Sequence, residues 1–393
     1  MFNNVISIPV HEKTEVVIDQ IFNYKFFCPN CGIVLHISKS FNWQDSFHNE
    51  KEFRFLLSQF ENVFVNPKSL NTLWGDIIHA HILNFEYISQ VADFEYFSMG
   101  SSNDLFIRRM PNFKNFDASF SGKKFNAAAS ADDEIWYWDK QCRNDKYLME
   151  ILKSNGATLY DVIQSQIEGS CYSKTLFQEI VTAIKKHYGE NEVSDKNKVI
   201  YPREEVYFPT LANLFNKNGN LKFNDNNYTF IAWGKPGMIP TVQEITDIAN
   251  GKMEGKYSIK RVLRTLDDKL RVAVGTQIGN YRAQALDFIK NTIPRTYLKF
   301  FNLTAGRKRI FIGFEKDRDL INGTFDAKFS EIFLPLNVQN NVVNLQNIAD
   351  SMRINSECLF VICVDFYPQI ANFLTQTGFR ENVDFINGTL FLP

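Results

Sequence analysis

The chain lacks an excess of charge of either sign, because its 43 lysine and arginine residues stand against 44 aspartate and glutamate residues. A net charge of -1 at pH 7 creates no overall field that would attract nucleic acid or an anionic membrane surface. Any anion site must therefore be formed locally by a few side chains, and no nucleic-acid partner is expected.

Long apolar runs are also missing. No stretch approaches the length of a membrane-spanning helix, which needs about 20 residues. The first ten residues carry no basic segment ahead of a long apolar one, as a secretory signal would. We therefore expect a cytoplasmic protein, and a peripheral association with the inner face of the cell membrane is compatible with this expectation.

Cysteine is scarce, and the six cysteines fit free thiols in a reducing compartment. Cys28 and Cys31 form one Cys-x-x-Cys pair, and no second pair at metal-ligand spacing accompanies it. A structural zinc site takes about four ligands, which His36 and the other cysteines could complete only by accident. The sequence also has no Gly-x-Gly-x-x-Gly motif, so it gives no support to dinucleotide binding.

What the chain does have is ample apolar material, with 45% hydrophobic residues that include 37 phenylalanines and 15 tyrosines. Its 393 residues exceed one ordinary core, so two domains are expected. We place the first over residues 1–300 and a smaller α/β domain over residues 306–393, with a linker at 293–306. The smaller domain shows no obvious chemistry and is a candidate surface for oligomer formation.

Strands and helices alternate through the first domain. Short β-branched runs at residues 5–10 and 33–37 flank a helical pattern at 15–27, and this alternation continues to a strand at 94–99. The pattern predicts an α/β fold with a doubly wound, mostly parallel sheet. Ligands of such sheets bind at the carboxyl ends of the strands, which is where the strand at 94–99 runs into the polar residues 101–104.

Two adjacent carboxylates, Glu204 and Glu205, lie between Pro202 and the apolar residues 206–208. A carboxylate pressed against an apolar run is partly desolvated and binds its proton more tightly, which suits a general base or acid. The alternative is a loop with two solvated glutamates ahead of a helix that begins near Pro209.

Basic side chains are concentrated in residues 256–271, where the leucine spacing predicts a helix. One interpretation is a solvated helix face on which Arg264 and Asp268 pair at i,i+4. The other is a phosphate clamp formed by Lys260 and Arg261.

Four stretches, in this order, resemble glycosyltransferases of the core-2/I-branching β-1,6-N-acetylglucosaminyltransferase and peptide O-xylosyltransferase family. They are residues 74–75 with the helix leading to 102–108, residues 168–170, residues 202–210, and Trp233 followed by residues 257–261. The resemblance covers residues 1–275 and implies a GT-A fold, a UDP-sugar donor and inversion at the anomeric carbon. It also implies that basic side chains, and no metal or other cofactor, neutralise the donor diphosphate.

The resemblance assigns roles to residues at matching positions. It makes Glu205, five residues before Thr210, the general base, and Lys260 with Arg261 the diphosphate clamp. The other candidates for binding donor or acceptor are Ser102, Asn103, Asp104, Glu168, Trp233 and Arg264. The chain departs from the family by having no arginine at residues 228–233, which leaves that phosphate contact unfilled or moves it to Lys235. It also lacks the membrane anchor and lumenal cysteines of animal members, which points to a bacterial enzyme.

The function expected from these observations is transfer of a hexosyl, N-acetylglucosaminyl or xylosyl group from a UDP-sugar to a glycan or lipid-linked glycan acceptor. The expected setting is synthesis of a bacterial surface polysaccharide. One alternative is a non-catalytic glycan- or nucleotide-binding protein on the same fold. Another is a phosphate-ester enzyme that uses the basic residues 256–271.

Overall fold

The computed structural model describes residues 1–72, 77–124, 138–188, 201–325, 332–336, 338–339, 342–343, 345–364 and 367–391. The tryptophan–glycine pair at residues 74–75, which carries part of the family resemblance, lies outside the described residues. The chain folds into two compact units. One comprises Met1–Asn49 and Phe60–Ile289, and the other comprises Glu50–Gln59 and Lys290–Pro393.

A seven-stranded sheet forms the centre of the first unit, in the order β10-β6-β9-β4-β1-β2-β3. Strand β1 runs parallel to both of its neighbours, so that Ile6 lies opposite Ile33 on β2 and Ser98 on β4. Strand β9 is antiparallel to both β4 and β6. The strands are β1 (Phe2–Val10), β2 (Cys31–Ile37), β3 (Val63–Val65), β4 (Phe94–Met99), β6 (Ala118–Ser119), β9 (Cys171–Ser173) and β10 (Phe223–Asn224).

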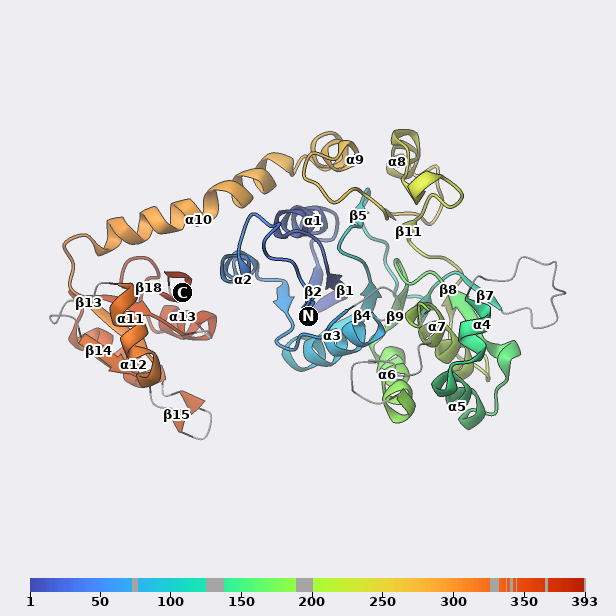
Figure 1. The fold of residues 1–393 in the computed structure, drawn as a ribbon, viewed down its shortest axis with the longest axis horizontal. Helices are drawn as coiled ribbons and strands as arrows, with labels where there is room; N and C mark the ends of the chain where they lie inside the picture. Colours follow the sequence, from blue (N-terminus) through green and yellow to red (C-terminus); the bar gives the residue numbers. More distant parts are fainter. Residues whose placement is uncertain are drawn as a thin grey trace. The chain divides into compact units, whose positions relative to one another are not determined.

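Helices cover both faces of this sheet. Helix α1 (Thr14–Phe27) joins β1 to β2, and α3 (Ile78–Val91) joins β3 to β4 on the other side of β1. Right-handed crossovers in opposite directions place the two helices on opposite faces, as Figure 1 shows. The other helices of this unit are α4 (Asp139–Arg143), α5 (Lys146–Ser154), α6 (Lys174–Tyr188), α7 (Glu204–Phe215), α8 (Val242–Ala249) and α9 (Lys269–Ala273).

Two small sheets complete the first unit beside the carboxyl end of β4. Strand β12 (Ser258–Ile259) pairs parallel with β11 (Thr229–Phe230) and antiparallel with β5 (Leu105–Phe106). Strands β7 (Gly122–Lys124) and β8 (Ile163–Ser165) form an antiparallel pair. These short strands bring residues 104, 168 and 260, which are far apart in the sequence, into one region.

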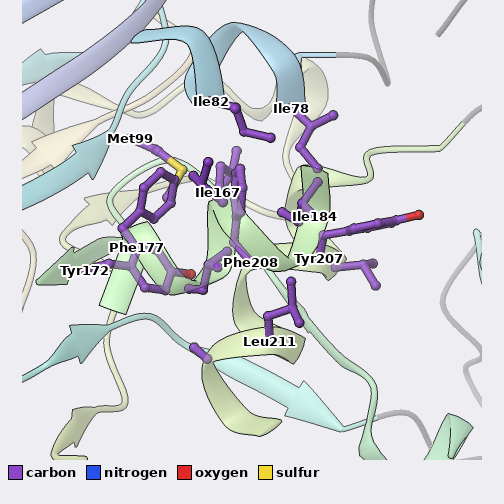
Figure 2. Close-up of a cluster of buried hydrophobic side chains, with 14 of the residues drawn as sticks. Ile78, Ile82, Met99, Ile167, Tyr172, Phe177, Ile184, Tyr207, Phe208 and Leu211 are labelled. Atoms are coloured by element: carbon purple, nitrogen blue, oxygen red, sulfur yellow. The ribbon is translucent and has the colours of Figure 1, made fainter. Parts of the chain in front are cut away.

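A large apolar core holds α3, α6 and α7 against β4 and β9, as Figure 2 shows. Phe177 of α6 lies 5.0 Å from Phe85, 4.8 Å from Phe97 and 5.1 Å from Phe208, measured between ring centroids. Burying one such ring stabilises the fold by on the order of 2 kcal/mol. Phe208 belongs to α7, so this packing also fixes the helix that carries Glu205.

The second unit has its own parallel sheet in the order β14-β13-β17-β18. Its strands are β13 (Arg309–Gly313), β14 (Ile332–Pro335), β17 (Leu359–Ile362) and β18 (Phe385–Asn387), with a separate hairpin of β15 (Val338–Gln339) and β16 (Val342–Val343). Its helices include α2 (Glu50–Ser58), α11 (Arg318–Thr324), α12 (Leu345–Ile354) and α13 (Tyr367–Gln376). Gly378 follows α13 with a φ of 98°, the left-handed position typical of a helix end.

The predicted fold class is confirmed: the chain is α/β, with a doubly wound, mostly parallel sheet and a smaller α/β unit toward its C-terminus. The linker predicted at residues 293–306 is wrong, because α10 spans Arg282–Thr304. Ala285, Ile289 and Ile293 repeat every four residues and are all buried, so this segment has an apolar stripe that favours a helix.

Candidate active site

Glu205 lies in the first turn of α7, which begins at Glu204 and not near Pro209 as the loop interpretation predicted. The reason is the apolar run at residues 206–208, which is completely buried and packs as part of the helix. Pro209 lies inside the helix and has no N–H, so the carbonyl of Glu205 cannot accept the usual bond from four residues ahead.

A buried carboxylate, Asp145, anchors the start of this helix. Its Oδ2 accepts hydrogen bonds from Arg203 Nε at 3.0 Å, Tyr201 Oη at 2.8 Å and Tyr207 Oη at 3.0 Å. Its Oδ1 accepts from two backbone amides of α5, which it caps. Sequence reasoning missed this group, because no spacing pattern connects Tyr201 with an aspartate 56 residues earlier.

Thr210 provides a second anchor. Its hydroxyl accepts a hydrogen bond from the Ile163 amide at 3.0 Å and donates to the Ile163 carbonyl at 3.2 Å. Helix α7 is thereby tied to β8, five residues beyond Glu205. Glu205 therefore lies between two anchors of α7, one at Asp145 and one at Thr210.

Glu168 and Lys260 form an ion pair beside Glu205, and the side chains are 5% and 15% exposed, respectively. The Oε2 atom of Glu168 is buried and has no hydrogen-bond partner among the residues that the structure describes. Glu168 was predicted to contact the acceptor, but in the folded chain one of its oxygens holds the lysine of the predicted diphosphate clamp.

The electrostatic environment raises the pKa of two carboxyl groups. Burial, together with the charge of Glu168, raises the pKa of Glu205 to about 8, although Lys260 and Arg261 act in the opposite direction. Burial and Glu168 likewise raise the pKa of Asp104 to about 7. Burial alone would lower the pKa of Lys260, but the carboxylates of Glu168 and Asp104 outweigh it and the pKa is raised.

The turn after β4 carries the predicted donor-binding residues. Asp104 accepts a hydrogen bond from the Ser101 amide at 2.8 Å, and the Ser101 hydroxyl lies 2.7 Å from an oxygen of both Asp104 and Asn103. Ser102 is buried, and its hydroxyl accepts from the amide of His11 at 3.4 Å. This contact joins the carboxyl ends of β1 and β4, the location expected for a ligand site.

The helix predicted over residues 256–271 is wrong, because only Lys269–Ala273 is α-helical there. Arg264 does not pair with Asp268. It forms an ion pair with Glu12 at 3.0 Å, and Asp268 caps α9. Arg261 follows β12 in a left-handed conformation with a φ of 71°, which is uncommon for a residue with a side chain.

Glu205 also lines a cavity of about 410 Å³. Other lining residues include Ser121, Gln166, Asn227, Trp233 and Lys256. Trp233 is 64% exposed, so its indole is available to a ligand. Lys235, the alternative phosphate contact, forms an ion pair with Glu244 at 2.8 Å. The site therefore offers a carboxyl group of raised pKa, an exposed aromatic ring, amides and nearby cations.

Three further features of the chain concern metal ions, thiols and membranes. Among the described residues, no group of three or more histidine, cysteine, aspartate or glutamate side chains could hold a metal ion. All six cysteines are buried free thiols. In the part of the chain that the structure describes, no helix has the length and apolar character of a membrane span.

No model of a known protein family matches the chain, and no curated protein matches it. Solved structures of glycosyltransferases do. The galactosyltransferase LgtC, in complex with donor and acceptor sugar analogues, aligns with a TM-score of 0.34 and 9% identity, over 70% of this chain and 95% of LgtC. The apo form of GlyE from Streptococcus pneumoniae aligns with a TM-score of 0.31 and 6% identity, over 95% of this chain and 90% of GlyE. A second GlyE structure aligns with a TM-score of 0.28 and 7% identity, over 99% of this chain and 96% of GlyE. Scores this low assign no activity to this chain.

Proposed function

We propose that the chain is an inverting glycosyltransferase that moves a sugar from a UDP-sugar to a hydroxyl of a glycan acceptor without a metal ion. The observation that carries this proposal is the position of Glu205. Its carboxyl group lines a cavity together with an exposed tryptophan, and the structure raises its pKa to about 8. A general base is most effective when its pKa lies near the working pH.

In the proposed reaction, the Glu205 carboxylate takes the proton of the acceptor hydroxyl. The hydroxyl oxygen forms a bond to the anomeric carbon of the donor while the bond from that carbon to the UDP oxygen breaks. The electron pair of the broken bond stays on the diphosphate. A positioned base contributes about a hundred- to ten-thousandfold to such a step.

The diphosphate gains negative charge as the bond breaks, and Lys260 and Arg261 are the cations we assign to it. Lys260 is largely buried, so its charge acts in a poorly hydrated site where an electrostatic interaction is stronger than in water. Its partner is Glu168. A bound diphosphate would compete for the same ammonium group, and Ser102, Asn103, Asp104 and Arg264 complete the proposed donor site.

The acceptor is proposed to bind in the cavity beside Trp233. An indole face packs against the C–H face of a sugar ring, and the amides of Gln166 and Asn227 can both donate to and accept from hydroxyl groups. The sequence resemblance carried by residues 202–210 and 257–261 is the basis for proposing a growing surface glycan, free or lipid-linked, as the natural acceptor.

The ion pair between Glu168 and Lys260 favours one other candidate, a glycan- or nucleotide-binding protein without turnover, because the clamp lysine is already engaged. Release of UDP from a panel of UDP-sugars, with and without glycan acceptors, separates the two. Acceptor-dependent UDP release that persists in EDTA is expected. Release that requires added manganese, or binding of UDP without any release, would contradict the proposal.

Lys260→Ala tests the clamp, with Lys269→Ala as its matched control. Lys269 is exposed at the start of α9, whereas Lys260 lies beside the carboxylates of the site. Lys260→Ala should lower kcat/KM for the donor by at least about tenfold, since a charge-assisted contact contributes roughly 1.5–3 kcal/mol. Equal effects of the two substitutions would place the diphosphate elsewhere.

A further inference from the structure

A second cavity, of about 540 Å³, lies in the first unit. It shares none of its described lining residues with the cavity of Glu205. The two cavities are nevertheless neighbours, because residues that are adjacent in the sequence line different cavities. Asn226 lines the second cavity and Asn227 the first, and Gly255 lines the second and Lys256 the first. Residues 226–227 and 255–256 therefore form a wall between the two cavities.

Hydrogen bonds fix this wall. Asn226 Nδ2 donates to the Gly255 carbonyl at 2.8 Å, and Lys256 Nζ donates to Asn226 Oδ1 at 3.1 Å. Ser119 Oγ donates to the Asn226 carbonyl at 2.7 Å. Gly255 has a φ of 68°, and a Cβ there would lie 2.3 Å from Asn226 Nδ2. The wall thus requires glycine at this position, and its own hydrogen bonds hold it in place. A fixed wall lowers the entropy lost on binding.

Aromatic rings form much of the second cavity. Tyr228 and Phe113 are buried, with ring centroids 6.0 Å apart, and Phe106 stacks behind Tyr228 at 5.7 Å. Tyr257 and Phe116 also line the cavity and are partly exposed. Rings fixed in this way provide rigid apolar surface, while the phenol groups of the tyrosines can hydrogen-bond.

The remaining lining is polar and acidic. Asn112 and Asn224 contribute amides, which both donate and accept hydrogen bonds. Asp225 and Glu254 contribute exposed carboxylates, and no lysine or arginine is among the described lining residues. Aromatic faces with amides suit the C–H faces and hydroxyl groups of a sugar. The two carboxylates disfavour an anionic ligand and favour a cationic one.

We propose that this cavity is a second carbohydrate-binding site, which takes a neutral or amino-bearing sugar unit. It lies across the wall from the proposed reaction cavity and goes beyond the transfer reaction, since binding here needs neither the donor nor Glu205. A glycan held at this site would be kept close to the reaction cavity by a contact separate from the one at Trp233.

The test uses the full chain and the methyl glycosides of glucose, N-acetylglucosamine, glucosamine and glucuronic acid, with binding followed by saturation-transfer NMR. Trp233→Ala removes the ring of the other cavity, so the remaining signal reports on the second one. We expect this signal to persist in Trp233→Ala and to fall at least about tenfold when Phe116→Ala is added. Loss of all signal in Trp233→Ala alone, or an unchanged signal in the double variant, would overturn the proposal.

A second measurement holds even if Phe116→Ala does not fold. Asp225 and Glu254 are exposed, so Asp225→Asn with Glu254→Gln should leave the fold intact. In the Trp233→Ala background, the methyl glycoside of glucosamine should bind at least about tenfold more tightly than that of glucuronic acid at low salt. Adding both Asp225→Asn and Glu254→Gln should abolish this preference. A preference that survives the double change, or one for glucuronic acid, would exclude the site. A failure of sugar transfer from UDP-sugars would contradict the proposed function and leave this binding unaffected.

Discussion

Glu204 and Glu205 are neighbours in the sequence but occupy different environments. Glu204 is 3% exposed and is not among the described residues that line the cavity, whereas Glu205 is. Glu205→Gln keeps the size of the side chain but cannot take a proton, so kcat should fall by about a hundredfold or more, with UDP binding near wild type. Glu204→Gln should have a smaller effect. Steady-state kinetics and calorimetry check both, and a reversed order would move the base to Glu204.

Glu168 is expected to control the pH dependence of the same reaction. Turnover requires ionised Glu205, so kcat/KM should rise with pH through an apparent pKa near 8. The charge of Glu168 is the second cause of this raised pKa. Glu168→Gln should therefore move the acidic limb of the pH–rate profile to lower pH. A limb that stays in place would show that Glu168 acts only through Lys260.

The raised pKa of Glu205 also predicts a pH-dependent stability difference. The folded chain keeps the proton up to a pH of about 8, while the unfolded chain releases it near 4.5. The unfolded state therefore binds fewer protons between these values, and this group's contribution to stability is lost as the pH rises. Glu205→Gln should become more stable than wild type by on the order of 5 kcal/mol at pH 9, because the two pKa values, about 8 and 4.5, are far apart. The gain should vanish below about pH 4. Denaturant unfolding at several pH values measures it.

The sequence predicted which side chains belong to the site better than it predicted their ion-pair partners. Asp104, Glu168, Glu205 and Lys260 were all candidates, and they lie together because short strands converge at one edge of the main sheet. The contact of Arg264 with Glu12 was not predictable, since residues more than 250 positions apart show no spacing relation.

Among the elements, α7 depends on a buried polar anchor as well as on its apolar face. Asp145→Ala would leave Arg203 buried without its carboxylate and should destabilise the fold by about 3–5 kcal/mol. Tyr207→Phe removes one hydrogen bond to the same carboxylate and should cost about 1 kcal/mol. Denaturant unfolding compares them, and similar losses from both would mean that the ion pair adds little.

Periodicity predicted the strands and helices of the main sheet, because their apolar faces are buried. The same signal misled in the basic segment. Leu263, Leu266 and Leu270 are spaced as on a helix, but Leu263 is 51% exposed, so no apolar stripe faces the core. The α-helix begins only where Asp268 caps it. Spacing indicates a helix only when the side chains concerned are buried together.

The second unit is built from two parts of the chain that are far apart in the sequence, because α2 packs with residues 290–393. Phe53, Leu56 and Leu57 are buried, and α2 contacts the turn Thr389–Phe391. A chain ending at Thr304 should expose these side chains, each worth about 1.5–3 kcal/mol, and aggregate. Adding Phe53→Ser and Leu57→Ser to the shortened chain should restore solubility and UDP binding, as light scattering and calorimetry would show. A shortened chain that stays soluble without these changes would show that α2 needs no cover.

The position of α2 also determines the order of events when the protein is made. Residues 50–59 leave the ribosome long before residues 290–393 have been synthesised, yet the two belong to one compact unit. At about 5–20 residues per second, the interval is on the order of ten seconds or more. During this interval the apolar side of residues 50–59 has no partner in the growing chain. Strands β2 and β3, which flank this segment in the sequence, can already pair. The length of this exposed interval is therefore set by translation speed, and a chaperone that binds residues 50–59 would cover them until residues 290–393 have been made.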